Sequence, residues 1–439
     1  MAVDISTSIA GVKMRSPFGV SSCDPDKALL PGKKYADIMM KYVDAGAGFI
    51  ISPAIKPGDP LPEEIAAEKS GLASDWQKLY RKQYYGRYCK VEDGTSIWAG
   101  HSLQLCMNFY EEWINALKPR LPKDVPICAQ SLVYEFDPQA WVDFSLKLEA
   151  MGADMIEINA GCPCDAMKGS PGIELPEESK YGAMMGTEPD LLCPIIKAVS
   201  SACKVPVGFK MTGEMAYPKF LFIAEKALAA GAKWVVTNHM SFSVAPPDIW
   251  NGGKTKFPAF DINPFGALMG SALRYQSYKT TAVISNTFPT LATWAGGGID
   301  KPEHVVEQIM LGASAVQTLH GIMHNGVSFI SRVNNFLCSF MEKCGYKTIE
   351  DFRGLGLKTF KGMNDGQFLD YVAKTDLGVC TNCGKCADTY CPAISMKNGV
   401  PITKIDECLG CGMCQIPCAV NAKRFIPREQ AISEGLCGA

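Results

Sequence analysis

The segment 152–158, Gly-Ala-Asp-Met-Ile-Glu-Ile, decides the fold, because its pattern recurs through roughly the first 340 residues. A Gly-Ala pair precedes a short apolar run here and again at Gly46, Gly231 and Gly312. Glycine accepts the left-handed backbone that ends many helices, and a continuous apolar run is typical of a buried parallel strand. Each landmark therefore predicts a helix that gives way to a strand.

A second set of apolar runs begins with proline, at Pro17, Pro126, Pro206 and Pro289, and alternates with the Gly-Ala set. Proline is tolerated at the first residue of a strand, where no ladder donor is required. Segments between the runs, such as 302–310, have helical periodicity. Eight strands, each followed by a helix, predict an α/β fold of the (β/α)8 TIM barrel type, with an open doubly wound sheet as the alternative.

The spacing of these landmarks predicts an insertion. The Gly-Ala intervals are 106, 79 and 81 residues, and the proline intervals are 109, 80 and 83. The excess in the first interval of each set places an aromatic-rich insertion between the second and third strands, at about 60–105. Loops that follow barrel strands lie on the catalytic face. We therefore expect the insertion either to cover the active site or to form a packing or subunit contact.

Composition restricts the class of protein. The chain has 439 residues, with 43 Lys and Arg against 45 Asp and Glu, so we expect no nucleic-acid partner. No apolar run approaches the roughly 18 residues of a membrane span, and the first residues lack the pattern of a secretory signal. We therefore expect a cytoplasmic protein that does not bind membranes.

Eight of the 19 cysteines fall between Cys380 and Cys418, in two runs of three at x2 spacing, each followed by one more cysteine. This is the pattern of a two-cluster ferredoxin, in which each [4Fe–4S] cluster takes its fourth ligand from the other run. One cluster is predicted on Cys380, Cys383, Cys386 and Cys418, and the other on Cys391, Cys408, Cys411 and Cys414. Two structural zinc sites are the alternative. Four residues, not three, separate Cys386 from Cys391.

A glycine-rich segment at 353–357 separates the two parts of the chain. We expect the barrel over 1–350 and a two-cluster ferredoxin-like domain over 370–439. Because each cluster passes one electron at a time, the barrel needs a cofactor that handles two, as a flavin does. The loops after strands seven and eight, where barrels often bind phosphate, carry glycines at 296–298 and 321. These loops predict a site for the phosphate of a flavin.

Polar residues end the fourth, fifth and sixth predicted strands. Strand four ends at Asn159 and leads to Cys162, with Cys164 as the alternative reactive thiol. Strand five ends with Lys210, and strand six ends at 237–239, Thr-Asn-His. A thiol can exchange a proton, an amide can bind a planar ring, and an ammonium can stabilise charge on a reduced flavin. His239 is either a substrate ligand or a packing residue.

These motifs resemble the dihydroorotate dehydrogenase superfamily, and within it the FMN- and iron–sulfur-containing part of dihydropyrimidine dehydrogenase. The resemblance covers nearly the whole chain outside the insertion, and it rests on 159–163 (Asn-x-x-Cys-Pro), Lys210, 237–238, 297–300 and the two cysteine runs. It implies that FMN exchanges a hydride with a ring carbon while Cys162 exchanges a proton with the neighbouring carbon. The implied substrate residues are Asn159, Asn238 and His239. The implied FMN residues are Ser21, Ser22, Lys210, Thr237, Gly270, Gly297, Gly298, His320 and Gly321.

We therefore expect an oxidoreductase that acts on a C–C double bond of a small cyclic substrate, with electrons passing between the clusters and FMN. No Gly-x-Gly-x-x-Gly follows an early strand, so a partner FAD subunit or a ferredoxin would connect the enzyme to NAD(P)H, in an oligomer. Where the family has a lysine after strand two, this chain has Ser52 and Pro53, with Lys56 nearby. The alternatives are an electron-transfer subunit of a larger redox complex and an ene-reductase for a non-pyrimidine conjugated substrate.

Overall fold

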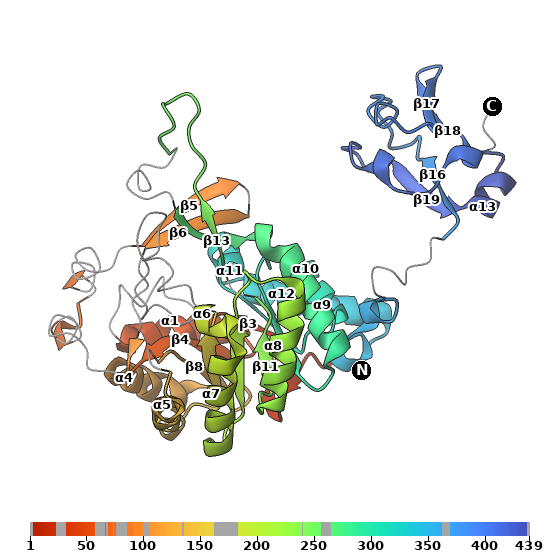
Figure 1. Ribbon diagram of the computed structural model, residues 1–439. Helices are drawn as coiled ribbons and strands as arrows, with labels where there is room; N and C mark the ends of the chain where they lie inside the picture. Colours follow the sequence, from red (N-terminus) through yellow and green to blue (C-terminus); the bar gives the residue numbers. More distant parts are fainter. Residues whose placement is uncertain are drawn as a thin grey trace. The chain divides into compact units, whose positions relative to one another are not determined.

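The computed structural model describes residues 3–22, 32–57, 66, 69–72, 74–75, 86–92, 94–100, 105–133, 136–161, 183–238, 240–255, 265–361 and 369–436. The chain divides into two compact units, residues 1–360 and 361–439, which are described separately below (Figure 1). Within the described residues, no helix has the length and apolar character needed to cross a membrane.

A closed barrel of parallel strands forms the centre of the first unit. Its eight strands are β3 (Phe18–Val20), β4 (Ile50–Lys56), β8 (Ile127–Ser131), β9 (Met155–Ala160), β10 (Val207–Met211), β11 (Trp234–Val236), β14 (Ala292–Gly296) and β15 (Ala315–Thr318). Each pairs in parallel with the next in this order, and β15 pairs with β3 to close the barrel. The predicted TIM barrel is confirmed, and closure excludes the open doubly wound sheet.

Helices alternate with these strands and surround them (Figure 1). The longer ones are α1 (Gly32–Asp44), α4 (Met107–Leu117), α5 (Pro138–Ala150), α7 (Pro189–Ala202), α8 (Tyr217–Ala229), α9 (Arg274–Thr287), α10 (Pro302–Met310) and α12 (Phe329–Cys344). Two short helices, α6 (Ala183–Thr187) and α11 (His320–Asn325), lie in the loops that follow β9 and β15. Apolar residues of the helices and of the strands' outer faces form one core cluster.

The Gly-Ala landmarks end helices α1, α5, α8 and α10 in the same way. The four glycines have φ of +102°, +104°, +107° and +99°, in chain order. At Gly152, the glycine N–H donates to the Glu149 carbonyl (2.9 Å) and the Ala153 N–H donates to the Leu148 carbonyl (3.2 Å). The same pair of bonds recurs at the other three landmarks, which is the Schellman arrangement. The predicted transitions from helix to strand are therefore confirmed at these positions.

The barrel lumen is apolar at the amino-terminal ends of the strands. Phe49, Trp234 and Trp294 pack there, with ring centroids 4.5 Å apart for Phe49 and Trp294 and 6.2 Å apart for the two indoles. Room for the Trp234 ring comes from Gly208, where an added Cβ would lie 2.2 Å from that ring. A hairpin of strands β1 (Thr7–Ile9) and β2 (Val12–Met14) adds side chains to the same cluster. Packing therefore closes this end of the barrel.

Two excursions from the barrel join in a four-stranded antiparallel sheet. Its order is β12 (Ser241–Val244), β13 (Phe265–Gly270), β6 (Thr95–Gly100) and β5 (Gly86–Glu92). Strands β5 and β6 belong to the segment interpreted as an insertion, and β7 (Leu105–Cys106) returns the chain beside β4. The excursion that carries β12 and β13 was not predicted. It lies in the last Gly-Ala interval, whose 81 residues are close to the 79 of the interval before it, so the landmark spacing shows no excess there.

The second unit is built from two small sheets and several tight turns. Strand β16 (Tyr371–Thr375) pairs with β19 (Lys423–Pro427), and β17 (Ile394–Lys397) forms a hairpin with β18 (Val400–Thr403). Helix α13 (Arg428–Ser433) follows β19. Three of its cysteines belong to the buried core of this unit, as Cys386, Cys408 and Cys414. None of the cysteines of this unit within 369–436 forms a disulfide.

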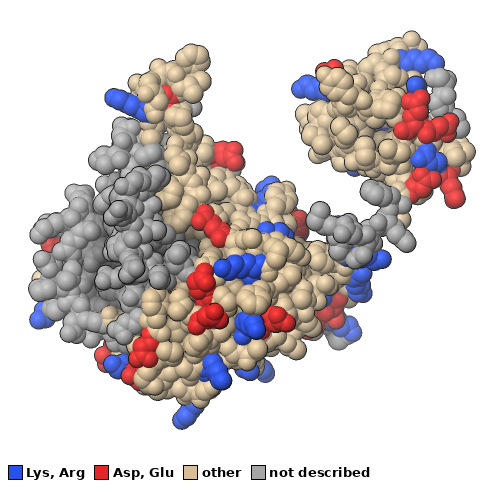
Figure 2. Space-filling model, in the orientation of Figure 1, with Lys and Arg blue, Asp and Glu red and all other residues tan. Residues whose placement is uncertain are grey.

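Charged side chains of both signs are interspersed on the face of the first unit that Figure 2 shows. Among the described residues, ion pairs join Lys118 to Asp154 (2.5 Å) and Arg120 to Asp37 (2.6 Å). Both pairs are partly or largely exposed to solvent, where an ion pair contributes little to stability. The fold is therefore stabilised by its core.

Candidate functional site

Buried polar side chains line the lumen at the carboxyl-terminal ends of the barrel strands. Side chains alternate along a strand, so Glu157 and Asn159 of β9 share a face with Met155, which belongs to the apolar cluster of the lumen. Lys210 of β10 pairs in register with Asn159. Six residues form this layer, and all are buried: Gln130, Glu157, Asn159, Lys210, Asn238 and Gln317.

Gln130 is the centre of a hydrogen-bond network in this polar layer. Its Oε1 accepts bonds from Ser22 Oγ (2.8 Å) and Asn159 Nδ2 (3.1 Å). Its Nε2 donates to Glu157 Oε1 (2.6 Å), and its backbone N–H donates to Ser52 Oγ (2.8 Å). Gln130 and Glu157 are not among the predicted site residues, although each is a polar residue inside an apolar strand. That interruption is the signal that could have found them.

Glu157 and Lys210 place an acidic and a basic side chain within the closed lumen. Burial raises the pKa of Glu157, and the Lys210 ammonium, the Gln130 amide and the Trp234 indole oppose the rise. Glu157 Oε2 has no hydrogen-bond partner among the described residues. The lumen therefore holds an ionisable pair at the position where barrel enzymes carry their chemistry.

Two amide side chains at the mouth have polar atoms without partners. Asn238 follows β11 and Gln317 lies in β15, and neither atom of either amide has a hydrogen-bond partner among the described residues. A buried polar group left unpaired costs about 1–3 kcal/mol. These amides therefore fit a site that holds a planar ligand with its own hydrogen-bonding groups.

Glycines bring several backbone segments together beside the mouth. Gly297 and Gly298, after β14, have φ of +94° and +76°. An added Cβ on Gly321 would lie 2.0 Å from the Ile299 carbonyl oxygen, and one on Gly270 would lie 2.8 Å from the His320 ring. Glycines that adopt positive φ and let backbone segments pack closely can form the cradle that a phosphate occupies. The glycine-lined backbone therefore fits the phosphate of FMN, and the Gly321 N–H itself donates to Thr318 Oγ1 (3.1 Å).

A cluster of charged side chains fixes the loop after β14. Asp300 Oδ1 lies 2.9 Å from His304 Nδ1 and 3.7 Å from Arg274 Nη1. Arg274 Nη1 is also 3.1 Å from His304 Nε2. Asp300 is the last residue of the Gly-Gly-Ile-Asp motif, so this contact connects the glycine loop to helices α9 and α10.

His320 joins the barrel to the antiparallel sheet. Its Nε2 lies 3.0 Å from Ser96 Oγ of β6, and burial lowers its pKa, which favours the neutral ring. Thr237 Oγ1 lies 3.1 Å from Thr281 Oγ1 of α9, so its hydroxyl faces that helix. Ser21 donates its N–H to the Thr318 carbonyl (3.1 Å), which keeps β3 beside the end of β15.

Several predicted residues fall outside the described part of the chain. Cys162, Cys164 and His239 lie outside the described residues, as does the side chain of Lys56. The structure places Asn159 and Lys210 in the buried polar layer, and half-buried Ser22 bonds to Gln130 of that layer. Their roles toward a ligand stay predictions.

The cysteine runs form a second candidate site, in residues 380–418. Backbone N–H groups donate to three of the sulfurs: Ala373 to Cys408 Sγ (3.3 Å), Asn382 to Cys380 Sγ (3.4 Å) and Ala422 to Cys418 Sγ (3.1 Å). Such bonds stabilise thiolate charge and tune iron–sulfur clusters. The Lys385 backbone N–H, in the same way, lowers the pKa of Cys383.

The two runs approach each other. Burial, with a contribution from the neighbouring Cys408, Cys386 and Cys391 and against the effect of Lys423, raises the pKa of Cys414 to about 11. Cys386 and Cys391 come from the first run, whereas Cys408 and Cys414 come from the second. The structure therefore brings cysteines of both runs together around Cys414.

No group of three or more His, Cys, Asp or Glu side chains in the described ranges is arranged to hold a metal ion.

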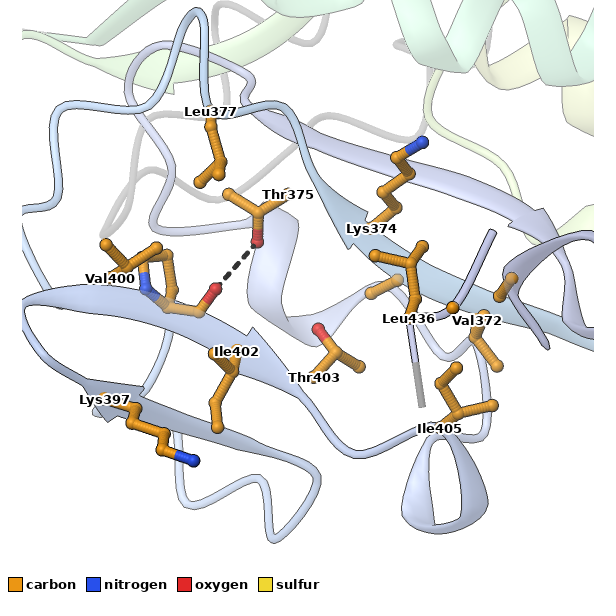
Figure 3. A pocket seen from close by; sticks show the side chains of 14 residues that line it. Val372, Lys374, Thr375, Leu377, Lys397, Val400, Ile402, Thr403, Ile405 and Leu436 are labelled. Carbon is orange, nitrogen blue, oxygen red and sulfur yellow. Dashed lines mark hydrogen bonds between the residues drawn. The ribbon is translucent and has the colours of Figure 1, made fainter. Parts of the chain in front are cut away.

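A cavity of about 290 Å³ lies in the second unit, between β16 and the β17–β18 hairpin (Figure 3). Its described lining includes Val372, Ile402 and Ile405 but no cysteine. This cavity is therefore separate from the cysteine runs.

Residues 119–239 match a protein family. The matching family model is described as dihydrouridine synthase. The matched residues contain β8, β9, β10 and β11, and with them Gln130, Glu157, Asn159 and Lys210 of the polar layer. The match therefore falls on half of the barrel and on most of its buried polar residues.

Similar proteins cover more of the chain. Dihydropyrimidine dehydrogenase (NADP(+)) of Arabidopsis thaliana chloroplasts is 25% identical over 82% of this chain and 79% of its own length. The dihydroorotate dehydrogenase B (NAD(+)) catalytic subunit of Methanocaldococcus jannaschii is 30% identical over 56% of this chain and 72% of its own. The NAD-dependent dihydropyrimidine dehydrogenase subunit PreA of Escherichia coli K12 is 24% identical over 87% and 84%.

Proposed function

Because the chain belongs to the dihydroorotate dehydrogenase family, we propose that it is an FMN- and iron–sulfur-dependent oxidoreductase acting on a C–C double bond of a small cyclic substrate. Enzymes of this family are flavin-dependent. The relatives are named as dehydrogenases of dihydropyrimidines and of dihydroorotate, which are reactions on a CH–CH donor. The observation that carries the proposal is the buried polar layer with unpaired amides beside a glycine-rich backbone cradle.

The chain's own residues would hold FMN at two places. Backbone N–H groups near Gly270, Gly297, Gly298 and Gly321 would bind its phosphate, and Ser22, Lys210 and the unpaired amides of the polar layer would face its ring system. When bound, FMN supplies the exchange of a hydride with carbon and of single electrons with iron–sulfur clusters.

Substrate binding and proton exchange fall to the residues after β9 and β11. The Asn238 amide, which lacks a partner among the described residues, would bind the polar edge of a ring, together with Asn159 and His239. Cys162 would hold a proton at its Sγ and exchange it with the substrate carbon next to the one that exchanges the hydride. A thiol suits this task because its ordinary pKa is within reach of neutral pH.

The cysteine runs of the second unit would hold two [4Fe–4S] clusters with the crossed ligand sets given above. In a cubane each thiolate binds a different iron, so the four sulfurs lie at separate corners rather than around one ion. Backbone N–H bonds to Cys380, Cys408 and Cys418 support this assignment. Electrons would pass one at a time between the clusters and FMN.

An oligomeric assembly with a partner would complete the electron path. The PreA relative is, by its name, a subunit of an NAD-dependent enzyme. We propose that NAD(P)H is oxidised by a partner FAD subunit or that a ferredoxin exchanges electrons with this chain. The purified chain alone should then reduce its substrate with an artificial one-electron donor and fail to do so with NADH or NADPH.

The first test is anaerobic purification with iron, sulfide and flavin analysis. We expect eight irons and one FMN per chain, followed by turnover on a panel of pyrimidines, dihydropyrimidines, dihydroorotate and non-pyrimidine enones. Cys162→Ala should abolish turnover while retaining FMN. Cys193→Ala, on α7 outside the lumen, is the matched control and should keep full activity. Full activity of Cys162→Ala would refute the proton role.

A non-pyrimidine substrate is the second candidate, and one observation favours it. Ser52 stands where the family has a lysine, and its hydroxyl is engaged by the Gln130 N–H and the Pro53 carbonyl, both at 2.8 Å. This position therefore offers the substrate neither an ammonium nor an unpaired hydroxyl. Turnover of enones without turnover of pyrimidines would select this candidate. Clusters without FMN would instead indicate an electron-transfer subunit.

A further inference from the structure

The turn of the β5–β6 hairpin bonds to the segment that follows β13, in the antiparallel sheet that Figure 1 shows. The Gly94 carbonyl, between β5 and β6, accepts the Ser271 N–H (2.7 Å), and Thr95 Oγ1 lies 2.9 Å from Ser271 Oγ. An added Cβ on Gly270 would lie 2.0 Å from the Gly94 carbonyl oxygen. The hairpin is therefore packed against Gly270, one of the four glycines proposed to hold the phosphate of FMN.

The same turn reaches the loop that follows β14. An added Cβ on Gly94 would lie 2.7 Å from Asp300 Oδ2, and Gly94 has φ of +71°. A side chain at this position would therefore be strained by the backbone and blocked by the carboxylate. Asp300 ends the Gly-Gly-Ile-Asp motif, 297–300. The hairpin of the predicted insertion therefore contacts two of the segments that carry the phosphate-site glycines.

His320, which opens α11, is a further contact of the hairpin, and only one of its ring nitrogens is paired. Its Nε2 lies 3.0 Å from Ser96 Oγ of β6. Its Nδ1 is buried and has no hydrogen-bond partner among the described residues. An added Cβ on Gly270 would lie 2.8 Å from this Nδ1, so the unpaired nitrogen lies beside a phosphate-site glycine. A buried polar atom without a partner is suited to a ligand.

The bond to Ser96 determines what the unpaired nitrogen can offer. A neutral imidazole carries a proton on one nitrogen only, and burial lowers the pKa of His320, which favours the neutral ring. A serine hydroxyl can donate to Nε2, and the ring proton then stays on Nδ1. Because the oxygens of a phosphate dianion only accept hydrogen bonds, Nδ1–H is the form that binds it.

We propose that the β5–β6 hairpin completes the cofactor site, with Ser96 positioning His320 so that its Nδ1–H binds the phosphate of FMN beside Gly270. This inference rests on the proposed function, because it requires FMN. It gives a role to the part of the chain that the family resemblance does not cover. His320 touches the cofactor, whereas Ser96 is a positioning residue that acts through the histidine ring.

His324 provides a matched control for His320. It stands one turn further along α11, and its ring is stacked on the His320 ring at 6.4 Å between centroids. His324 is exposed, and none of its contacts among the described residues reaches the phosphate-site glycines. Replacing it therefore removes a histidine from the same helix without removing the proposed phosphate ligand.

The experiment compares the affinity of the flavin-free full chain for FMN and for riboflavin, which lacks the phosphate, by fluorescence titration. His320→Ala should raise the dissociation constant for FMN about tenfold and that for riboflavin by no more than about twofold. Ser96→Ala should raise the FMN constant about fivefold, and Ser96→Thr, which keeps the hydroxyl, should restore it. His324→Ala should leave both constants unchanged.

A double variant tests whether Ser96 acts through His320. Ser96→Ala combined with His320→Ala should bind FMN no more weakly than His320→Ala alone, because the serine has no effect once the ring is absent. Additive losses would overturn the positioning role of Ser96.

The outcomes separate this inference from the proposed function. Wild-type protein that binds neither flavin would overturn the proposed function. Wild-type binding of FMN with an unchanged constant in His320→Ala would overturn only this inference. Equal losses for FMN and riboflavin would overturn it as well, because the damage would then not concern the phosphate. If His320→Ala does not fold, the ratio of the two constants in Ser96→Ala decides, and an unchanged ratio counts against the inference.

Discussion

The two layers of the barrel lumen differ in what their side chains contact. At the amino-terminal ends of the strands, Trp294 packs against Phe49 and Trp234 and is fully buried. At the carboxyl-terminal ends, Gln317 is equally enclosed but neither atom of its amide has a partner among the described residues. The first layer maximises packing, whereas the second accepts a cost in stability. The difference teaches that burial alone does not identify the core, because the unpaired amides of the carboxyl-terminal layer, called the upper layer below, fit a bound ligand.

The largest effect on stability is expected in the apolar layer at the amino-terminal ends of the strands, called the lower layer here. Trp294→Ala should lower the free energy of unfolding by about 3–5 kcal/mol, because it removes a large buried ring and leaves a cavity. Urea denaturation of flavin-free protein, followed by circular dichroism, measures this loss. A loss below about 1 kcal/mol would show that the lower layer does not carry the stability of the barrel.

In the upper layer, Gln317→Leu should affect the cofactor more than the fold. Replacing an unpaired buried amide by an apolar group of similar size removes a desolvation cost. The free energy of unfolding of the flavin-free protein should therefore be unchanged or higher by about 1 kcal/mol. The dissociation constant for FMN should rise about tenfold, which equals about 1.4 kcal/mol. Fluorescence titration with FMN measures it.

Gln308→Leu is the matched control for Gln317→Leu. Gln308 is a buried glutamine of α10, outside the lumen, and its Nε2 donates to Ser277 Oγ (2.7 Å). Its replacement should destabilise the fold by about 1–2 kcal/mol and leave FMN affinity unchanged. The reverse pattern, with Gln308 and not Gln317 affecting FMN, would contradict the division of the lumen into two layers.

The sequence predicted the barrel well because local signals determine its strands. A glycine that must adopt positive φ and a proline that opens a strand act within a few residues, so their spacing reveals the elements. The pairing of the β5–β6 hairpin with β13 depends on chain segments far apart, and no local signal reports it. The place of Gln130 at the centre of a hydrogen-bond network depends on the pairing of β8 with β9, which the sequence does not report.

The candidate site was predicted in part for the same reason. Glycines 297 and 298 were found from their motif, and their positive φ agrees with it. Glu157 was overlooked because it stands in an apolar strand whose other residues favour a core assignment. The hydroxyl of Thr237 faces Thr281 of α9, a contact that the sequence does not reveal because it depends on the helix packed outside the strand, and the role of Thr237 at the cofactor stays a prediction.

A smaller effect is expected from Glu157, as a dependence on pH. Its raised pKa means that the folded state binds a proton more readily than the unfolded state. Stability is therefore lost as pH rises from 4.5 through the raised pKa, by about 1.4 kcal/mol for each unit of the rise.

Glu157→Gln should remove this slope, so the variant gains stability relative to the wild type as pH increases. Urea unfolding measured at a series of pH values tests it. Asp143→Asn, on the exposed face of α5, is the control and should leave the slope in place. Parallel curves for wild type and Glu157→Gln would mean that the upper layer holds no buried titrating carboxyl.

The smallest effect on stability is expected outside the lumen, at the glycines that end the helices before the strands. At Gly152 an added Cβ would meet only Ile114 Cδ1, at 3.9 Å, so Gly152→Ala isolates the cost of positive φ, about 1 kcal/mol. At Gly312 the added Cβ would also lie 2.4 Å from Ser285 Cβ, so Gly312→Ala should cost more in the same denaturation assay. Equal costs would mean that the backbone conformation, and not the space beside it, determines why glycine stands at all four landmarks. In either case FMN affinity should stay unchanged, because these glycines precede β9 and β15 and so stand at the strand ends opposite the loops that would hold FMN.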